Sequence, residues 1–289
     1  MGWMLSSISR EAPVLIAGPT ASGKSALALE LAARDGRIVV NADALQVYGC
    51  WRLLTARPSA EEEAQVPHRL YGHVGREETY SVGHWLRDVR AVLGEKIVIV
   101  GGAGLYFRAL TEGLAEIPAI PADVRQEADA LRANDPAAMV AALDPETAAQ
   151  IDLANGARVQ RAWEVLRATG RGIADWQRDT PLPDLPRPKA EALVLKPDVD
   201  WLNARIDRRF DMMMAQGALD EARQELPYWE PTRPSARAIG APELIAHLQG
   251  RFGLDEAIAA AKLASRQYAK RQRTWFRSQM GAWTPVELP

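Results

Sequence analysis

A glycine-rich pattern at residues 18–25, Gly-Pro-Thr-Ala-Ser-Gly-Lys-Ser, is the feature that most constrains the fold of this chain. It follows an apolar run at residues 13–17 and precedes helix-forming residues 26–31. In this strand–loop–helix setting the pattern predicts a phosphate-binding loop, because its glycines let backbone N–H groups turn inward and the helix N-terminus adds partial positive charge. A glycine turn without a ligand is the alternative, which the complete pattern disfavours. The chain is thus expected to bind a di- or triphosphate, and the pattern does not say which.

The end of this pattern defines its chemistry. Lys24 is expected to bridge phosphate oxygens, and the Ser25 hydroxyl is expected to contact Mg²⁺. The residues predicted to bind the phosphates are Gly18, Thr20, Ala21, Ser22, Gly23, Lys24 and Ser25.

Further apolar runs predict the sheet to which the loop belongs. They occupy residues 38–40, 97–100 and 193–195, and a helical segment at residues 84–93 lies between two of them. Uninterrupted apolar strands that alternate with helices indicate a parallel sheet buried on both faces. The predicted fold class is therefore α/β, a P-loop core with a parallel sheet flanked by helices.

A second, all-helical unit is expected within the chain. Residues 111–150 are rich in alanine and in acids, a helix is predicted at residues 157–169, and four prolines between residues 181 and 188 form a stiff linker. Beyond Lys196 the chain is expected to be helical almost throughout. The predicted domains are a core, residues 1–113 with 188–289, and a helical insertion, residues 114–187.

Asp43 is the acid that stands close behind an early strand, in Asn41–Tyr48. The strand at residues 97–100 ends in glycines instead of the acid that nucleotide hydrolases use for Mg²⁺. Because strand ends on the carboxyl edge share one crevice, Asp43 is expected near the phosphate loop. Its carboxylate could be a base or a metal-linked group, or it could be a loop acid or helix cap, and position alone leaves both interpretations open.

Cations gather near the C-terminus. Residues 257–279 contain no acid, and glutamines and aromatic residues lie between the cations Lys262, Arg266, Lys270, Arg271, Arg273 and Arg277. Several of these share one helix face, which indicates either contact with a polyanion or a solvated face. Arg205 and Arg209 also share a face, and either could reach a phosphate.

Charge and cysteine content exclude some classes of protein. Lys and Arg number 35 against 37 Asp and Glu, a net charge of −2 that disfavours an indiscriminate nucleic-acid binder. Cys50 is the single cysteine, so an internal disulfide and a cysteine-based zinc site are excluded, and a reducing cytoplasm fits. Residues 1–10 lack the pattern of a secretory signal, and no apolar run approaches the ~20 residues that span a bilayer.

Taken together, these segments resemble the tRNA dimethylallyltransferase (tRNA isopentenyltransferase) family. The resemblance covers nearly the whole chain in one order, which is far more specific than the phosphate loop alone. The matching segments are GPTASGKS at 18–25, NADALQVY at 41–48, VPHRL and ETYSVGHW within 66–85, GGAGLYFRAL at 101–110, RVQRAWEVLRATG at 158–170, RIDRRFDMMM at 205–214, SARAIG at 235–240 and RQYAKRQRTWFR at 266–277.

The resemblance implies transfer of a dimethylallyl group from its diphosphate to N6 of the adenosine 3′ to the anticodon, position 37, with release of diphosphate. It implies Asp43 as the base, Lys24 and Arg205 as groups that stabilise the leaving diphosphate, Mg²⁺ at Ser25, and an insertion that contacts the anticodon stem-loop. The expected partners are tRNA and dimethylallyl diphosphate, without DNA or membrane. A cytoplasmic location fits the single cysteine, and a monomer is the default because the sequence shows no sign of an oligomer interface. The residues implied to bind tRNA are Asp43, Ala44, Leu45, Gln46, Ala103, Arg125, Arg158, Val159, Gln160, Arg161, Arg237, Gln267, Lys270 and Arg271.

Some positions depart from the family pattern. The family commonly has Ser where Asn41 and Ala44 stand, Arg at Leu45 and Thr at Ala103, and Gly240-Ala241-Pro242-Glu243 replaces its usual GYKE. A hydroxyl lost at Ala103 is expected to weaken binding by about 0.5–1.5 kcal/mol, without abolishing it. Because Asp43, Lys24 and the C-terminal segment are retained, we expect activity.

Two other functions are compatible with the phosphate loop. A small-molecule kinase could use ATP there, with Asp43 holding the acceptor hydroxyl, but this leaves the cationic C-terminal segment and the helical insertion unexplained. A catalytically silent RNA-binding protein is the other alternative.

Overall fold

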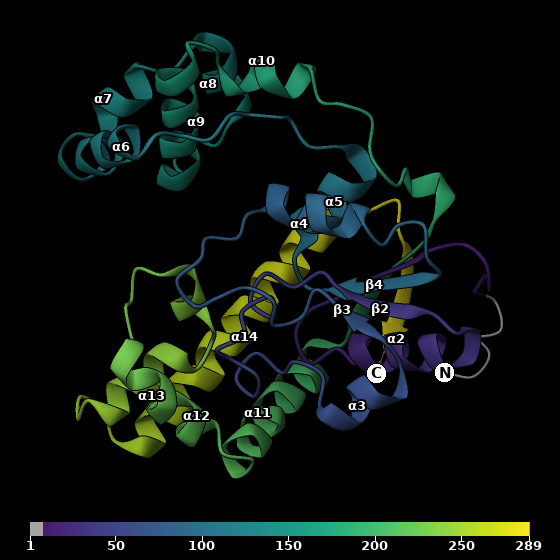
Figure 1. The fold of residues 1–289 in the computed structure, drawn as a ribbon. Coiled ribbons are helices and arrows are strands. Elements are labelled where there is room, and N and C mark those ends of the chain that lie inside the picture. Colours follow the sequence, from purple (N-terminus) through teal and green to yellow (C-terminus); the bar gives the residue numbers. More distant parts are fainter. Residues whose placement is uncertain (1–7, 289) are drawn as a thin grey trace. The chain divides into compact units, whose positions relative to one another are not determined.

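The computed structural model describes residues 8–288, so the interpretation of the extreme N-terminus as free of a secretory signal lies largely outside the described residues. The chain forms two compact units (Figure 1). The first combines Met1–Thr111 with Leu185–Pro289, and the second is Glu112–Asp184. Among residues 8–288 no helix is long and apolar enough to cross a membrane.

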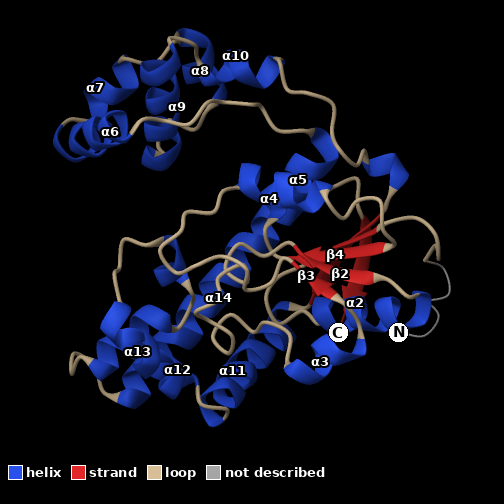
Figure 2. Cartoon of the chain, in the orientation of Figure 1, coloured by secondary structure: helices blue, strands red, loops and turns tan. Residues whose placement is uncertain are grey.

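The first unit is built on a parallel sheet (Figure 2). Within residues 8–288 this sheet has six strands in the order β3-β2-β4-β1-β5-β6, and every neighbouring pair runs parallel. The predicted α/β class and the three further apolar strands are confirmed. The strands are β1 (Val14–Ala17), β2 (Ile38–Asn41), β3 (His68–Arg69), β4 (Ile97–Gly101), β5 (Glu191–Pro197) and β6 (Thr284–Leu288).

The last strand corrects the expectation of helices beyond Lys196. Residues Thr284–Leu288 pair with β5 at the sheet edge, and Val286 is the one buried residue of this strand. Pro285 lies within it, which an edge strand tolerates because one side of its backbone has no neighbour to hydrogen-bond. A short strand with one buried side chain lacks the apolar run that identified the inner strands.

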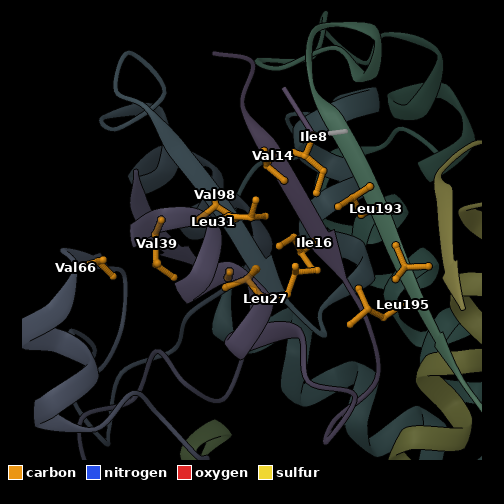
Figure 3. Packing of buried hydrophobic residues seen from close by; sticks show 14 residues of the cluster. Ile8, Val14, Ile16, Leu27, Leu31, Val39, Val66, Val98, Leu193 and Leu195 are labelled. Carbon is orange, nitrogen blue, oxygen red and sulfur yellow. The ribbon is translucent and has the colours of Figure 1, made fainter. Parts of the chain in front are cut away.

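Helices flank the sheet in the first unit. They are α2 (Lys24–Asp35), α3 (Ala60–Gln65), α4 (Val82–Arg90), α5 (Gly104–Glu112), α11 (Val199–Ala215), α12 (Ala218–Glu225), α13 (Ala241–Leu248) and α14 (Leu254–Gln279), with 3₁₀ turns at Arg187–Lys189, Leu226–Tyr228 and Pro234–Arg237. Leu27 and Leu31 of α2 pack on a core that includes Ile16 of β1 and Val98 of β4 (Figure 3). Burial of these side chains anchors the helix that begins directly after the phosphate loop.

The long helix α14 packs against α11 and α13. Lys262 of α14 forms an ion pair with Asp211 of α11 at 2.6 Å, and Arg266 pairs with Asp207 at 2.5 Å. Two of the cations on the predicted stripe are therefore neutralised by the neighbouring helix. Lys270, Arg271 and Arg277 remain exposed nearer the end of α14.

The second unit is all-helical. Its helices are α6 (Ala122–Asn134), α7 (Pro136–Ala141), α8 (Pro145–Gln150), α9 (Gly156–Thr169) and α10 (Ile173–Arg178). Side chains of α6, α7 and α9, among them Met139 and Trp163, form its core. Asp135 and Asp144 accept hydrogen bonds from amides at the starts of α7 and α8, so part of the acidic bias of residues 111–150 consists of helix caps.

Candidate functional site

The phosphate loop connects β1 to α2 in a left-handed turn. Ala21 has φ +61° and Gly23 has φ +92°, conformations that alternate the direction of successive amides. Lys24 and Ser25 are the first residues of α2, so their amides point past the helix start, where an anion can accept them. The Lys24 ammonium donates to the carbonyl of Pro19 at 3.3 Å, which holds it over the loop.

A cleft of about 360 Å³ opens in front of this loop. Ala21, Gly23, Lys24 and Ser25 line it together with side chains of α11 and of the segment before β3. Burial lowers the pKa of Lys24 to about 8, although the Asp43 carboxylate opposes that change. The other lining side chains that carry polar groups are Gln46, Arg57, Glu62, His68, Tyr71, Arg205, Arg208 and Arg209.

Two loop residues predicted to contact phosphate do not line a cleft. The amide of Gly18 donates to Gly101 O at 3.3 Å, and the amide of Ser22 donates to Pro19 O at 3.3 Å. Ser22 is 1% exposed, and its hydroxyl has no hydrogen-bond partner among the described residues. The prediction of direct phosphate contact is therefore wrong for Gly18 and Ser22, which shape the loop from beneath.

Two arginines of α11 donate hydrogen bonds to the phosphate loop. Arg205 Nε donates to Ala21 O at 3.0 Å, and Arg209 Nη1 donates to the Thr20 hydroxyl at 3.3 Å. Burial lowers the pKa of Arg209, with Asp43 acting in the opposite direction. From the sequence, either arginine of this helix face could reach a phosphate, and the family resemblance assigns a role to Arg205; in the structure both line the cleft.

Asp43 follows β2 in a fixed turn. Asn41 accepts the Asp43 amide at 2.8 Å and donates its side-chain N–H to Asp43 O at 2.9 Å and to Leu70 O at 3.0 Å. One carboxylate oxygen, Oδ1, accepts the amide of Leu45 at 3.0 Å. Oδ1 of Asp43 therefore stabilises the turn, while no hydrogen bond from residues 8–288 reaches its Oδ2.

A second, smaller cleft of about 60 Å³ adjoins Asp43. Its charged lining residues are Asp43 and Arg209, and Thr20, Thr55, Ser265 and Tyr268 add polar side chains. The remaining walls are mainly apolar side chains of Leu45, Leu54, Ile206, Phe210, Met213 and Ile239. Ala21 and Arg209 line both clefts. The carboxylate of Asp43 and the phosphate loop therefore face adjoining spaces.

Glycines after β4 allow the loop that carries Ala103 to pass close to Asp43. A Cβ on Gly101 would lie 1.9 Å from Ala42 O, and the amide of Ala103 donates to that same carbonyl at 3.0 Å. A Cβ on Gly104 would lie 2.0 Å from the Trp275 ring. A side chain at Gly101 would push the loops after β2 and β4 apart, and one at Gly104 would displace Trp275 of α14.

Three buried tyrosines missed by sequence analysis feel the charge of Asp43, and one of them, Tyr268, lines the same cleft. Burial raises the pKa values of Tyr71, Tyr106 and Tyr268, and the negative charge of Asp43 raises them further. Their hydroxyls therefore stay protonated and can donate hydrogen bonds. Tyrosines scattered over nearly 200 residues carry no spacing signal, so the folded chain is needed to find them.

The predicted tRNA-binding residues of the first unit have different environments. The Gln46 side chain donates to Thr55 O and Ala56 O, both at 2.8 Å, so it supports the neighbouring turn. Leu45 and Ala103 are half-buried. Side chains open to solvent belong to Ala44, Arg237, Gln267, Lys270 and Arg271.

In the second unit Arg125 and Arg158 are exposed. Gln160 accepts from Arg132 and donates to Asp129 and Glu164. Arg161 lies 3.7 Å from Glu164, and burial lowers the pKa of Arg161. Val159 corrects the prediction, because it is 3% exposed and belongs to the core of α6, α7 and α9, where its side chain cannot contact a ligand.

Comparisons with known proteins agree with one another. The model of the IPP transferase family matches residues 46–279, and that of the isopentenyl transferase family matches residues 12–76. A tRNA dimethylallyltransferase of Cereibacter sphaeroides is 69% identical over 99% of this chain and 92% of its own length. One of Dinoroseobacter shibae is 63% identical over 98% of this chain and 97% of its own length.

Solved structures extend this similarity to the fold. The full-length tRNA isopentenylpyrophosphate transferase from Bacillus halodurans has a TM-score of 0.68 and 33% identity, covering 96% of this chain and 90% of that one. A eukaryotic dimethylallyltransferase acting on tRNA has a TM-score of 0.79 at 24% identity, covering 96% and 74%, and this likeness concerns the fold alone.

Proposed function

The chain belongs to the tRNA dimethylallyltransferase family, and we propose that it transfers a dimethylallyl group from dimethylallyl diphosphate to N6 of the adenosine 3′ to the tRNA anticodon, position 37. The observation that carries the proposal for its own residues is the adjoining pair of clefts, one lined by the phosphate loop and one by Asp43. A kinase reaction on the same loop is not favoured by this family membership.

The donor diphosphate fits the larger cleft. Lys24 and the amides at the start of α2 would bind its oxygens, and Arg205 and Arg209 would add positive charge from α11. Negative charge grows on the diphosphate as the C1–O bond of the allyl group breaks, so donors fixed in advance stabilise the transition state more than the ground state.

The acceptor nitrogen requires a base. The N6 lone pair of adenine is delocalised into the ring, and N6 must lose a proton as its bond to C1 of the allyl group forms. Asp43 would take that proton on Oδ2, while Oδ1 remains bound to the Leu45 amide. The adenine must leave its stack to reach this cleft. The products are the N6-prenylated adenosine, free diphosphate and a proton held by Asp43.

Mg²⁺ fits the residues around the phosphate loop. The Ser25 hydroxyl is exposed at the start of α2, and residues 8–288 contain no cluster of three acidic, histidine or cysteine side chains that could hold a metal without help. Mg²⁺ commonly keeps several waters and binds through few protein groups together with phosphate oxygens. When bound, it would neutralise charge on the diphosphate, with Ser25 as its protein ligand.

We place tRNA contacts on both units. Arg125, Arg158 and Arg161 of the second unit, the helical insertion that we expect to contact the anticodon stem-loop, are suited to phosphates, as are Arg237, Lys270 and Arg271 of the first. Gln160 and Gln267 would contact the RNA nearby, and Ala44, Leu45, Gln46 and Ala103 would border the flipped base. We expect the protein to act as a cytoplasmic monomer.

The proposed reaction has a direct test. The protein is incubated with unmodified tRNA, Mg²⁺ and dimethylallyl diphosphate, and the digested nucleosides are analysed by mass. We expect a prenylated adenosine that maps to position 37. Its absence across all tRNAs of the source organism would refute the proposal.

Binding of inorganic diphosphate should depend on the proton of Lys24. Because burial lowers the pKa of Lys24 to about 8, the ammonium is lost in the free protein as the pH rises through 8. The anion binds the protonated form, so the Kd should rise about tenfold between pH 7 and pH 9. Titration calorimetry at several pH values measures this change.

Lys24→Arg is the matched variant, because its guanidinium stays protonated throughout this range. Its pH profile reports the titration of diphosphate itself, and the profile of the natural protein should be steeper. Identical slopes for the two proteins would contradict the role of Lys24.

A further inference from the structure

Gln272 of α14 is a buried polar side chain in a helix whose neighbouring polar groups are largely exposed. The Gln272 residue is only 5% exposed. Burial of a carboxamide costs free energy unless its donor and its acceptor are both satisfied.

Both groups of Gln272 are satisfied by backbone from distant parts of the chain. Its Oε1 accepts the amide of Thr20 at 2.8 Å, and its Nε2 donates to Gly102 O at 3.2 Å. An amide N–H on one side and a carbonyl on the other permit one orientation of the carboxamide.

The two loops joined by Gln272 carry the two halves of the site. Thr20 belongs to the phosphate loop, and its hydroxyl accepts a hydrogen bond from Arg209 of α11. On the other side, a Cβ placed on Gly102 would lie 2.1 Å from Gln272 Nε2 and 3.4 Å from Oδ2 of Asp43. The carboxamide of Gln272 and the carboxylate of Asp43 therefore both lie close to Gly102.

We infer that Gln272 is a positioning residue that fixes the phosphate loop relative to Asp43 by bridging Thr20 and Gly102. This inference rests on the proposed prenyl transfer. Gln272 lines neither cleft, and the groups that would bind diphosphate, Lys24 and Ser25, do not hydrogen-bond to it. Its loss should therefore reduce kcat far more than it weakens diphosphate binding, because small errors in the geometry of reacting groups are costly.

Gln272→Met removes both hydrogen bonds at similar volume. We expect kcat to fall by about 10- to 100-fold while the Kd of inorganic diphosphate changes less than about threefold. Hydrogen exchange of the Thr20 amide should be at least about tenfold faster, because its acceptor is lost. Gln279→Met is the matched control on an exposed turn of the same helix, where Gln279 donates to its neighbour Ser278.

Gln272→Glu separates the two hydrogen bonds. Its carboxylate can still accept the Thr20 amide but cannot donate to Gly102, so Thr20 should stay protected while kcat falls. This variant carries the test if Gln272→Met fails to fold.

A folded Gln272→Met variant with kcat within twofold of the natural protein, or with unchanged exchange at Thr20, would overturn the inference. A parallel loss of kcat, diphosphate binding and thermal stability would also overturn it, because that pattern indicates a general structural role. If the natural protein forms no prenylated adenosine, the proposed function fails, and exchange at Thr20 still tests the bridge.

Discussion

Asp43→Asn should lower kcat for prenyl transfer by about 10²–10⁴-fold while tRNA still binds. The asparagine Oδ1 can keep the hydrogen bond from the Leu45 amide, so the turn after β2 is preserved and the charge of Oδ2 is removed. An amide cannot accept the N6 proton at neutral pH, so the reaction loses its base. Asp43→Ala should lower turnover by about 10²-fold or more as well, with some loosening of the turn.

Single-turnover kinetics with saturating tRNA, together with tRNA binding by fluorescence, measure these effects separately. Asp255→Asn is the matched control, because Asp255 is exposed in the first turn of α14 and lines neither cleft. It should retain natural turnover. Near-natural turnover of Asp43→Asn would exclude Asp43 as the base.

Arg37→Met should lower the free energy of unfolding by about 3–5 kcal/mol. The Arg37 side chain is fully buried and donates to Ser9 O at 2.6 Å, Ala12 O at 2.8 Å and Ile97 O at 3.2 Å. Its Nε also donates to the Asp35 carboxylate at 3.1 Å. Methionine fills part of the volume but leaves three carbonyls without a donor, and each such group costs about 1–3 kcal/mol.

Urea unfolding measures the free energy of unfolding of the natural protein and of three variants, Arg37→Met, Arg37→Lys and Arg10→Met. Arg10 is exposed, so its variant should unfold within about 0.5 kcal/mol of the natural protein. Lysine keeps the charge but not the planar set of donors, so its loss should be intermediate. A loss below about 1 kcal/mol for Arg37→Met would show that the network contributes little.

Lowering the pH below 4 should lower the free energy of unfolding, because Asp35 of the same network becomes protonated. A hydrogen bond from Arg34, supported by Arg37, lowers the pKa of Asp35 from 3.8 to about 2. A lowered pKa in the folded state means that the contribution of Asp35 is complete above pH 4 and is lost as the pH falls toward 2.

The sequence predicts elements that carry a strong local signal. Of the six strands in residues 8–288, four follow from continuous apolar runs, because a strand buried on both faces needs such residues at every position. β3 has two residues, and β6 has one buried side chain with a proline inside it, so neither produces such a run.

Helix α9 (Gly156–Thr169) carries a local signal that predicts the burial of Val159. Val159, Ala162 and Trp163 recur at the three- and four-residue spacing of one helix face, and all three are buried. This apolar stripe identifies Val159 as a core residue, whereas position within a family motif suggested contact with RNA. Arg158, its neighbour, lies outside the stripe and is exposed.

Part of the site can also be predicted from the sequence, because some of its residues lie close after a strand. The phosphate loop follows β1 and Asp43 follows β2, so strand order alone places both near the same edge of the sheet. Gln272 lies 252 residues from Thr20 and 170 from Gly102, and no spacing rule joins positions so far apart. Arg209 reaches the loop because α11 packs beside it, which is a result of tertiary packing.

Because Gln272 lies so far along the sequence from Thr20 and Gly102, the site is completed late in synthesis of the chain. β1 and the phosphate loop emerge from the ribosome early, but β5, β6 and Gln272, which complete the sheet edge and the loop bridge, lie beyond residue 190. A nascent chain that ends before Gln272 therefore has a phosphate loop without its buried anchor. Because domains form as units during translation, the phosphate loop and Asp43 reach their final arrangement only after α14 has been made.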